Sequence, residues 1–496
     1  MIENLNVKTR YGTFNGFVDE NGVKTWLGIP FAQPPVGKLR WQAPQPLQPS
    51  DKTFDAKKFG NDPIQASMKL GNLVDMPDTG NITQSEDCLT LNIFTRGEGK
   101  NKPVMVWIFG GGFVCGSANE STYTESNFVL DHDIILVTIN YRLNFFGFMN
   151  LAEIDKNFED SGYLGIKDQI AALKWIKENI SNFGGNPENI TVFGESAGSI
   201  STFFLTIAPK TKNLFQKVIP QSGAVGSYKT PEDSAQVAEN FMEFCGAKKI
   251  SDLMKKSALE LQNYYAKFIS NREMNVADFY PTCDGKFLPK NPFKALKEGA
   301  ARGIKILTGT TADEWRAFLL ANENLFELVR KDSQNISPIF SRYKKQTNEE
   351  IYKNWLKNRP DTADTYGDFS TQIDWRVAQE ICAEYQSKFD DVYFYLFTQQ
   401  PSPPLEYLGA FHALDLSYTF NVPYIEPNPN QNLVKIIQAS WAAFATTGNP
   451  DNEFIPHWEK YSADNRQTME LNSKKCILHK DLNTENLNSL RYIYEN

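Results

Sequence analysis

Short runs of consecutive apolar residues recur along most of the chain, separated by stretches of mixed polarity. They are rich in Val, Ile, Leu and Phe and do not alternate with polar residues, which is typical of strands buried on both faces. The runs cover residues 103–109, 134–140, 190–194, 217–221, 304–309 and 392–397. Such strands lie in sheets covered by helices, so the pattern predicts an α/β fold with a large, mostly parallel central sheet.

Apolar residues recur at spacings of three and four between these runs, most clearly over residues 165–183. This spacing places apolar side chains on one face of a helix, and the following Gly184 and Gly185 are typical of a helix C-terminus. Residues 225–300 and 315–385 are charged and show helical patterns without an obvious strand. We therefore predict that both segments form helical insertions over the sheet.

The N-terminal part has a different pattern. Residues 7–18 and 23–29 are rich in β-branched and aromatic residues, and the Asp-Glu-Asn-Gly sequence at 19–22 is a hairpin-type turn. An N-terminal β-hairpin is expected there. The proline-rich residues 30–49 are expected to wrap a surface, because proline fixes φ and removes an N–H donor. Since no internal repeat or low-complexity linker is found, residues 1–496 are expected to form one elaborated domain.

The composition is that of an ordinary globular protein, since 41% of the 496 residues are hydrophobic and the net charge is −8. An acidic chain offers no broad cationic surface, so neither nucleic acid nor a membrane is an expected partner. No apolar stretch approaches the roughly 18 residues that span a bilayer. The beginning of the sequence lacks the features of a secretory signal, and the six cysteines are scattered without a C-x-x-C pair. These features favour a cytoplasmic protein with free thiols.

A candidate nucleophile lies where a predicted strand meets a predicted helix. The Gly-Glu-Ser-Ala-Gly sequence at 194–198 follows the apolar run 190–194 and opens the helical segment 197–208. In this context a G-x-S-x-G motif forms a sharp turn that projects the serine hydroxyl above the sheet, and glycines avoid Cβ clashes there. Ser196 is therefore the predicted nucleophile. The structural alternative is a glycine- and serine-rich helix start without chemistry.

A serine nucleophile needs a base, and the chain has four histidines. His132 lies at the entrance to a strand, and His457 and His479 lie in loop-like or terminal stretches, so these three are interpreted as surface or packing residues. His412 follows the last central strand run and a loop. The order serine, acid, histidine along the chain places the base at this point.

The acid that orients the histidine is expected after a strand between Ser196 and His412. The run 304–309 is followed by a Thr/Gly loop and then by Asp313 and Glu314, and either carboxylate fits the pattern. The structural alternative is a negative charge that interacts favourably with a helix N-terminus, and this alternative fits Asp313 better.

An oxyanion hole is the remaining component of such a site. The Gly-Gly-Gly-Phe loop at 110–113 directly follows a predicted strand, and its backbone can approach a ligand closely. The expected donors are the N–H groups of two of these glycines and of Ala197.

Further motifs occur in order along nearly the whole chain. They include GIPFAQPPVGKLRW at 28–41, EDCLTLNIF at 86–94, FGGNPENITVFGESAGS at 183–199, GTTADE at 309–314 and GAFHALDL at 409–416. With these motifs the chain resembles the type-B carboxylesterase family, the cholinesterase-like α/β-hydrolases, and is most similar to bacterial para-nitrobenzyl esterase-like members. The resemblance implies an α/β-hydrolase fold with no metal or organic cofactor.

The resemblance also implies individual roles. It places the serine at Ser196, the acid at Glu314 rather than Asp313, and the base at His412. Glu195 is implied to stabilise the charged histidine, with a buried carboxylate satisfied by backbone amides as the alternative. The implied oxyanion donors are Gly111, Gly112 and Ala197.

The expected substrate pocket follows from the same comparison. Phe109, Phe113 and Phe318 are predicted to line it, although Phe109 stands where family members often have His or Tyr. Trp315 stands where glycine is usual, so the loop after the acid is expected to differ. Residues 74–87 contain no aromatic residue, whereas cholinesterases use a tryptophan in that neighbourhood to bind quaternary ammonium.

The sequence therefore predicts a serine carboxylesterase that hydrolyses uncharged short- to medium-chain alkyl or aryl esters. The expected partner is a small-molecule ester, and the protein is expected to be a monomer or a homodimer. Two alternatives stay open. One is hydrolysis of another acyl bond, in a carbamate, amide or lactone, because the same triad serves them all. The other is a non-catalytic binding protein on the same scaffold.

Overall fold

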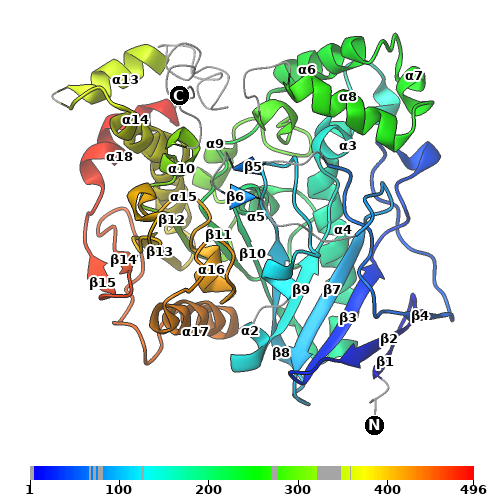
Figure 1. The fold of residues 1–496 in the computed structure, drawn as a ribbon, viewed down its shortest axis with the longest axis horizontal. Helices are drawn as coiled ribbons and strands as arrows, with labels where there is room; N and C mark the ends of the chain where they lie inside the picture. Colours follow the sequence, from blue (N-terminus) through cyan, green and yellow to red (C-terminus); the bar gives the residue numbers. More distant parts are fainter. Residues whose placement is uncertain are drawn as a thin grey trace.

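The structure is a computed structural model that describes residues 5–65, 69–70, 74–75, 82–124, 128–270, 276–320, 348–357 and 359–495. Within these residues, thirteen strands form one twisted sheet (Figure 1). Their order is β1-β2-β3-β7-β9-β8-β10-β11-β12-β13-β14-β15, and β4 pairs with β2 outside this path. From β9 to β14 all neighbours are parallel, whereas the strands at both ends of the order are antiparallel.

The strands have the following bounds. They are β1 (Leu5–Thr9), β2 (Gly12–Val18), β3 (Val23–Pro30), β4 (Thr53–Asp55), β7 (Thr90–Arg96), β8 (Lys102–Ile108), β9 (Ile135–Ile139), β10 (Gly185–Glu195), β11 (Lys217–Gln221), β12 (Lys305–Thr311), β13 (Val392–Phe397), β14 (Thr468–Leu471) and β15 (Ile477–His479). A separate pair contains β5 (Lys69–Leu70) and β6 (Val74–Asp75).

The predicted parallel strands are confirmed. The apolar runs of the sequence correspond to β8 through β13, and their residues are almost entirely buried. Val192 in the middle of β10 pairs with Val106 of β8 on one side and with Val218 of β11 on the other. Continuous apolar sequence is required at such positions because neighbouring strands and covering helices exclude water from both faces.

The N-terminal prediction needs a correction. Residues 7–18 do not form one strand, because the chain turns at Arg10 and Tyr11 and separates β1 from β2. The Thr9 hydroxyl accepts a hydrogen bond from Tyr11 N at 3.0 Å and donates one to Gly12 O at 3.1 Å. Gly12 has a φ of +134°, which side-chain-bearing residues rarely adopt. The predicted hairpin is therefore part of an antiparallel series that continues through β3 into β7.

The helices that cover the sheet have clear starts and ends. The predicted helix over 165–183 is α4 (Leu164–Asn179) followed by a 3₁₀ turn, η4 (Ile180–Phe183), and it ends at Gly184 with a φ of +90°. α5 (Ala197–Ile207) packs against β10 and β11, and α17 (Gln431–Thr447) packs against β8 and β10. Among the described residues, no helix has the length and apolarity needed to cross a bilayer.

The two segments predicted as insertions are helical where they are described. Residues 225–300 contain α6 (Pro231–Phe244), α7 (Ile250–Met254), α8 (Ala258–Ser270), η5 (Val276–Phe279) and α9 (Pro292–Lys297). Residues 315–385 contain α10 (Arg316–Leu320), α13 (Asn348–Leu356), α14 (Ala363–Ser370), the π-helical turn η7 (Thr371–Arg376) and the start of α15 (Val377–Gln386). Residues 271–275 and 321–347 lie outside the described part. In Figure 1, α6–α8 and α13–α14 form two separate groups at the top of the molecule.

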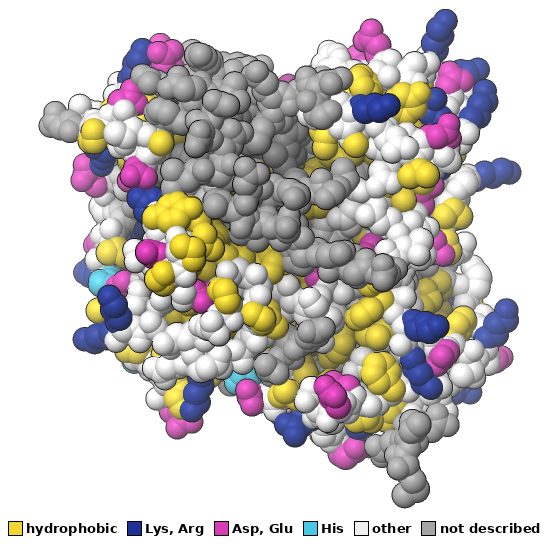
Figure 2. All heavy atoms as spheres, in the orientation of Figure 1, with side chains coloured by type: hydrophobic (Ala, Val, Ile, Leu, Met, Phe, Trp, Pro, Cys, Tyr) yellow, Lys and Arg dark blue, Asp and Glu magenta, His cyan; other side chains and the backbone are white. Residues whose placement is uncertain are grey.

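Short elements connect these parts. They are α1 (Ser121–Thr124), α2 (Phe128–Asp131), α3 (Asn144–Phe148), α16 (Leu416–Thr419), α18 (Thr484–Leu490), η1 (Gly37–Leu39), η2 (Lys156–Phe158), η3 (Ser161–Tyr163), η8 (Glu406–Leu408) and η9 (Arg491–Ile493). Lys and Arg side chains are scattered among Asp and Glu on the described surface in Figure 2, without a continuous basic patch on this face.

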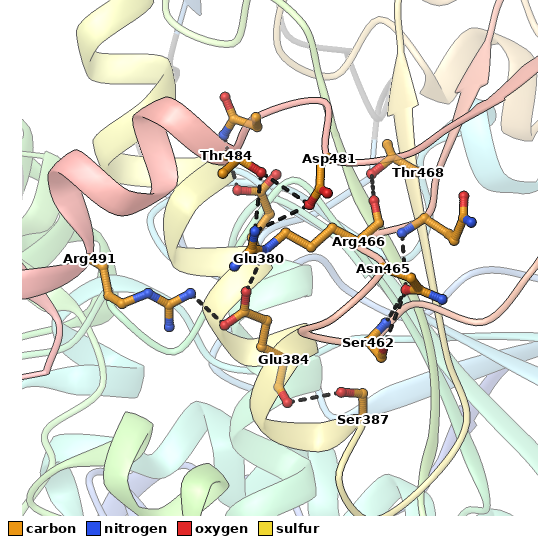
Figure 3. A network of polar contacts seen from close by, with 12 residues as sticks. Glu380, Glu384, Ser387, Ser462, Asn465, Arg466, Thr468, Asp481, Thr484 and Arg491 are labelled. Carbon is orange, nitrogen blue, oxygen red and sulfur yellow. Dashed lines mark hydrogen bonds and ion pairs between the residues drawn. The ribbon is translucent and has the colours of Figure 1, made fainter.

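The C-terminal part is fixed to the body by charged side chains (Figure 3). Glu384 of α15 accepts hydrogen bonds from Arg466 Nε at 3.0 Å and from Arg491 Nη2 at 2.5 Å. Arg466 also donates to Thr484 Oγ1 at 3.1 Å and to Asp481 Oδ1 at 3.2 Å. A single carboxylate therefore joins α15 to the loop before β14 and to the last turn of the chain.

Candidate active site

Ser196 lies in a sharp turn between β10 and α5. Its φ of 56° and ψ of −120° are strained for a residue with a side chain, and its N–H donates to Gln221 O at 3.0 Å. A Cβ atom at Gly194 would lie 2.6 Å from Ile108 O, and one at Gly198 would lie 2.0 Å from the same oxygen. The flanking glycines are therefore required by close backbone packing, and Ser196 stays half-buried at the end of β10.

The structure brings His412 and Glu314 into direct contact. His412 Nδ1 lies 2.6 Å from Glu314 Oε2, and the Glu314 side chain is fully buried. The other oxygen of Glu314 accepts a hydrogen bond from Thr311 N at 2.8 Å, at the end of β12. Since a carboxylate only accepts hydrogen bonds, Nδ1 carries the proton. This contact fixes the orientation of the imidazole and leaves Nε2 to face the rest of the site.

Asp313 has a different place from Glu314. Its Oδ2 accepts a hydrogen bond from Ala410 N at 2.8 Å, and Asp313 N donates to Ala410 O at 2.9 Å. Arg316 Nη1 lies 3.6 Å from Asp313 Oδ1. Asp313 therefore joins the loop after β12 to the loop that carries His412, which is a more specific role than the helix-terminal charge considered from the sequence.

Glu195 faces the other ring nitrogen of His412. Its Oε1 lies 3.1 Å from Nε2, without hydrogen-bond geometry, and both side chains are buried. Burial raises the pKa of the Glu195 carboxyl above its ordinary value, although the charge of His412 opposes this shift. Burial alone would lower the pKa of His412, but the charges of Glu195, Glu314 and Asp415 outweigh it and raise that pKa.

Asp415 is a buried acid that the sequence did not single out. It lies three residues after His412 and directly before α16, and its Oδ2 accepts a hydrogen bond from Gln221 Nε2 at 2.9 Å. Burial raises the pKa of Asp415 to about 6. The only sequence signal for it is the spacing of three residues from His412, which is too common to identify a functional acid.

The Ser196 hydroxyl and His412 are both described, and no hydrogen bond joins them. Catalytic hydrogen bonds are often long or poorly aligned in ligand-free structures and shorten when substrate binds. The resting site therefore has the imidazole held by Glu314 at Nδ1 and opposite Glu195 at Nε2, with the serine still free.

The glycine loop after β8 supplies the candidate oxyanion donors. Gly111 and Gly112 have φ values of 94° and 62°, and a Cβ atom at Gly111 would lie 2.3 Å from Cys115 O. Within the described residues, the N–H groups of Gly111, Gly112 and Ala197 have no hydrogen-bond acceptor in the protein. Unpaired backbone donors beside a serine are the arrangement that stabilises a developing oxyanion.

The three predicted pocket phenylalanines have different environments. Phe109 is fully buried and stacks on Tyr141 with ring centroids 4.4 Å apart. Phe113 is also fully buried and packs edge-on against Phe148. These two rings support the glycine loop from the core. Phe318 is half-buried, and its ring centroid lies 5.5 Å from that of His412.

Two tryptophans complete the aromatic surroundings of His412. Trp375 lies with its ring centroid 4.5 Å from the imidazole, and Trp315 packs against Phe318 at 5.3 Å. Both indoles are half-buried. Nothing in the local sequence indicated that Trp375 reaches the site. The stretch 74–87, expected to lack a choline-binding aromatic residue, falls partly outside the described residues, since 76–81 are not described.

The remaining histidines lie in other environments. His457 Nδ1 contacts Asp451 at 2.7 Å and is exposed, His479 Nε2 contacts Glu470 at 2.8 Å, and His132 packs against Phe128. Over the described ranges, no group of three or more His, Cys, Asp or Glu side chains is arranged to hold a metal ion. The chemistry that this arrangement supports is nucleophilic attack by a serine with a histidine base.

Comparison with known proteins gives matches over nearly the full length. The model of the Carboxylesterase family matches residues 3–490. The chain is 36% identical over 484 residues to the para-nitrobenzyl esterase of Bacillus subtilis, with 95% of each protein covered. A solved thermophilic PNB esterase has a TM-score of 0.86 at 34% identity, and the match covers 98% of this chain and 99% of that one. A carboxylesterase of Geobacillus stearothermophilus has a TM-score of 0.84 at 31% identity, with the same coverage.

Proposed function

Because the chain belongs to the carboxylesterase family and has the α/β-hydrolase fold of its structural neighbours, we propose that this carboxylic-ester hydrolase acts through Ser196, His412 and Glu314. We propose further that its substrates are uncharged short- to medium-chain alkyl or aryl esters. The observation that carries the proposal is the 2.6 Å contact between His412 Nδ1 and the fully buried Glu314. Among the described residues, His412 is also the histidine whose imidazole contacts Glu195, the residue next to Ser196.

In the first half of the reaction, Ser196 Oγ attacks the ester carbonyl carbon and His412 Nε2 takes the hydroxyl proton. Glu314 accepts the Nδ1 hydrogen bond throughout and stabilises the imidazolium that forms. The carbonyl oxygen gains negative charge and accepts hydrogen bonds from the N–H groups of Gly111, Gly112 and Ala197. The tetrahedral intermediate then expels the alcohol, which takes its proton from His412, and an acyl-Ser196 ester remains.

In the second half, a water molecule attacks the acyl carbon while His412 Nε2 accepts its proton. The same N–H groups hold the second oxyanion. Collapse of this intermediate breaks the bond to Ser196 Oγ, which recovers its proton from His412, and the carboxylic acid leaves. No group other than the ester and water is consumed.

The proton distribution between His412 and Glu195 matters for this mechanism. A base must have a free lone pair at Nε2, yet the surrounding carboxylates raise the pKa of His412. Glu195, whose Oε1 lies 3.1 Å from Nε2, contributes the largest of these charges. Glu195 is therefore assigned the role of stabilising the imidazolium that forms when His412 takes the proton of Ser196.

Two features support the proposed substrate range. Half-buried aromatic side chains lie beside His412: Phe318 and Trp375 pack against its ring, and Trp315 packs against Phe318, which favours apolar acyl or alcohol groups. The relative from Bacillus subtilis is named for activity on a para-nitrobenzyl ester. We also propose a cytoplasmic location, because the six cysteines are buried and none of them is joined in a disulfide.

The direct test is hydrolysis of p-nitrophenyl esters of increasing acyl length by the wild type and by Ser196→Ala and His412→Ala. Both variants are expected to lose at least about 10⁴-fold in kcat, and an organophosphonate probe is expected to label Ser196. His457→Ala is the matched control, because His457 also contacts a carboxylate but lies outside the site. Wild-type protein that neither hydrolyses any ester nor takes the label would contradict the proposal.

A further inference from the structure

The π-helical turn η7 joins α14 to α15 beside the catalytic histidine. Such turns contain one extra residue relative to an α-helix, are rare and occur frequently at functional sites. This turn covers Thr371–Arg376 and ends in Asp374, Trp375 and Arg376. The extra residue alters which side chains face the sheet, and here it directs Trp375 onto His412, with ring centroids 4.5 Å apart and planes inclined by 41°.

Hydrogen bonds fix the turn to the loop that carries the acid. Trp315, the residue after Glu314, donates its backbone N–H to Thr371 Oγ1 at 3.1 Å and its indole N–H to Asp374 Oδ2 at 2.8 Å. Thr371 is fully buried. The element that places Trp375 is therefore joined directly to the element that places Glu314.

The other end of the turn is anchored in the body of the protein. The buried Arg376 guanidinium lies with Nε 3.6 Å from Glu380 Oε1, and Glu380 Oε2 accepts a hydrogen bond from Asn483 at 3.0 Å. Glu380 belongs to the polar network of Figure 3. The contacts to Trp315 before Trp375 and the contact of Arg376 to Glu380 after it therefore fix the backbone on both sides of Trp375.

The indole is held by packing and not by a hydrogen bond of its own. Trp375 Nε1 is buried and has no partner in the described part of the chain. Four other tryptophans share this property, but Trp107, Trp175, Trp355 and Trp458 are buried in the core, whereas Trp375 is half-buried beside His412. Trp375 therefore differs from these four tryptophans in that its ring packs against the imidazole of His412.

We propose that Trp375, presented by the π-helical turn, is a positioning residue that keeps the His412 imidazole in its hydrogen bond to Glu314 while Nε2 changes partner from Glu195 to Ser196. The inference rests on the proposed function of the site. Glu314 restrains the ring at Nδ1 only, and rotation about that hydrogen bond would move Nε2. The Trp375 ring on one side, with Phe318 at 5.5 Å, restricts this rotation. Both separations lie in the range of about 4.5–7 Å at which neighbouring aromatic rings are usually found.

The test compares Trp375→Phe and Trp375→Leu. Because we assign the effect on His412 to the ring of Trp375 and not to its N–H, Trp375→Phe is expected to retain kcat within about 3-fold of the wild type. Trp375→Leu is expected to lower kcat by about 3- to 10-fold and to keep KM within about 2-fold of the wild type. A second readout is the strongly deshielded ¹H NMR signal of the His412 Nδ1 proton, assigned by its loss in Glu314→Gln. This signal is expected to persist in Trp375→Phe and to broaden or disappear in Trp375→Leu.

The matched control is Trp458→Leu, which removes an indole of the same type from the core, where it packs against Tyr393. This variant is expected to lower the free energy of unfolding but to leave the Nδ1 proton signal, kcat and KM unchanged. Thr371→Val provides a second route if Trp375→Leu does not fold, because it removes the acceptor of Trp315 N–H and is expected to shift both readouts in the same direction.

A wild-type signal and wild-type kcat in Trp375→Leu would overturn the proposal, as would equal changes in Trp458→Leu. The NMR measurement needs no substrate. If the wild type hydrolyses no ester, the proposed function fails, while the response of the Nδ1 signal still decides whether Trp375 positions the imidazole.

Discussion

His412 faces three carboxylates, and their charges together determine when it acts as a base. Glu314 contacts Nδ1, Glu195 lies opposite Nε2, and Asp415 follows three residues later in the chain. Burial opposes the charged form of the imidazole, but these carboxylates outweigh it and raise the pKa of His412. Since the base must be neutral, activity is gained as the pH rises through this pKa.

The first prediction concerns Glu195→Gln. The substitution keeps the size of the side chain but removes the charge that makes the largest single contribution to raising the pKa of His412. A lower pKa leaves His412 neutral at lower pH, so the acid limb of the pH profile of kcat/KM is expected to move down by about 1 pH unit. The measurement is kcat/KM for an uncharged ester between acidic and mildly alkaline pH.

Two variants make this comparison quantitative. Asp415→Asn is expected to move the acid limb in the same direction but less, because Asp415 contributes less than Glu195 to the shift. Asp451→Asn, beside the exposed His457, is expected to have no effect. An acid limb that stays in place or moves to higher pH in Glu195→Gln would show that another group controls the profile.

At the scale of the elements, the loops after β12 and β13 hold the acid and the base against one another. Asp313 accepts the Ala410 N–H, two residues before His412. Gly409 has a φ of +67°, and a Cβ atom there would lie 2.3 Å from Asp313 Oδ2. Only glycine fits both the backbone conformation and the close approach of the carboxylate.

The second prediction follows from this contact. Gly409→Ala is expected to lower the free energy of unfolding by about 2–4 kcal/mol, through strain and displacement of Asp313, and to lower kcat by displacing His412. Gly303→Ala is the matched control, because Gly303 has a φ of +92° but no atom within 4 Å of the added Cβ. Urea denaturation and ester kinetics would separate the two effects. Equal losses in both variants would mean that the Asp313 contact adds nothing beyond backbone strain.

The same elements show how far sequence reasoning reaches. The strands β8 to β13 were predictable because burial on both faces requires continuous apolar residues, and the Ser196 turn was predictable because close packing requires glycines at fixed positions. Trp375 was not predictable. Its approach to His412 depends on a π-helical turn, and a single extra residue in a helix leaves no pattern that periodicity can detect.

The surroundings of the glycine loop and the first strand show a second limit. Phe109 and Phe113 adjoin this loop in sequence, and both rings are fully buried, while their place in the substrate pocket stays a prediction. Residues 7–18 are one β-rich run in the sequence, and the turn inside them is marked by the conformation of Gly12 and by the hydrogen bonds of Thr9. Local composition predicted β structure for residues 7–18, whereas the strand ends depended on tertiary packing.

At the scale of the whole molecule, C-terminal residues contact α15, the same helix that supports the site. α15 follows the π-helical turn directly, and its Glu384 contacts Arg466 and Arg491, two residues from separate C-terminal elements (Figure 3). Glu384 is 5% exposed, and the two arginines are 20% and 22% exposed, so solvent screens these pairs only weakly. Removing one partner from such a network leaves the other charges unpaired.

The third prediction is therefore that Glu384→Gln destabilises the C-terminal part more than a surface pair would. Because the arginines keep some solvent contact, the loss in the free energy of unfolding is expected to be about 1–3 kcal/mol, below the full value for a buried pair. Hydrogen exchange is expected to increase first in η9 and in the adjoining α18, since Arg491 at the start of η9 loses its contact to α15. Glu298→Gln is the matched control: its partner Lys294 lies 3.8 Å away and both side chains are about two-thirds exposed, so its effect is expected to stay below about 0.5 kcal/mol. Uniform exchange across the molecule in Glu384→Gln would instead mean that the C-terminal part unfolds only together with the sheet, and that Glu384 contributes to global rather than local stability.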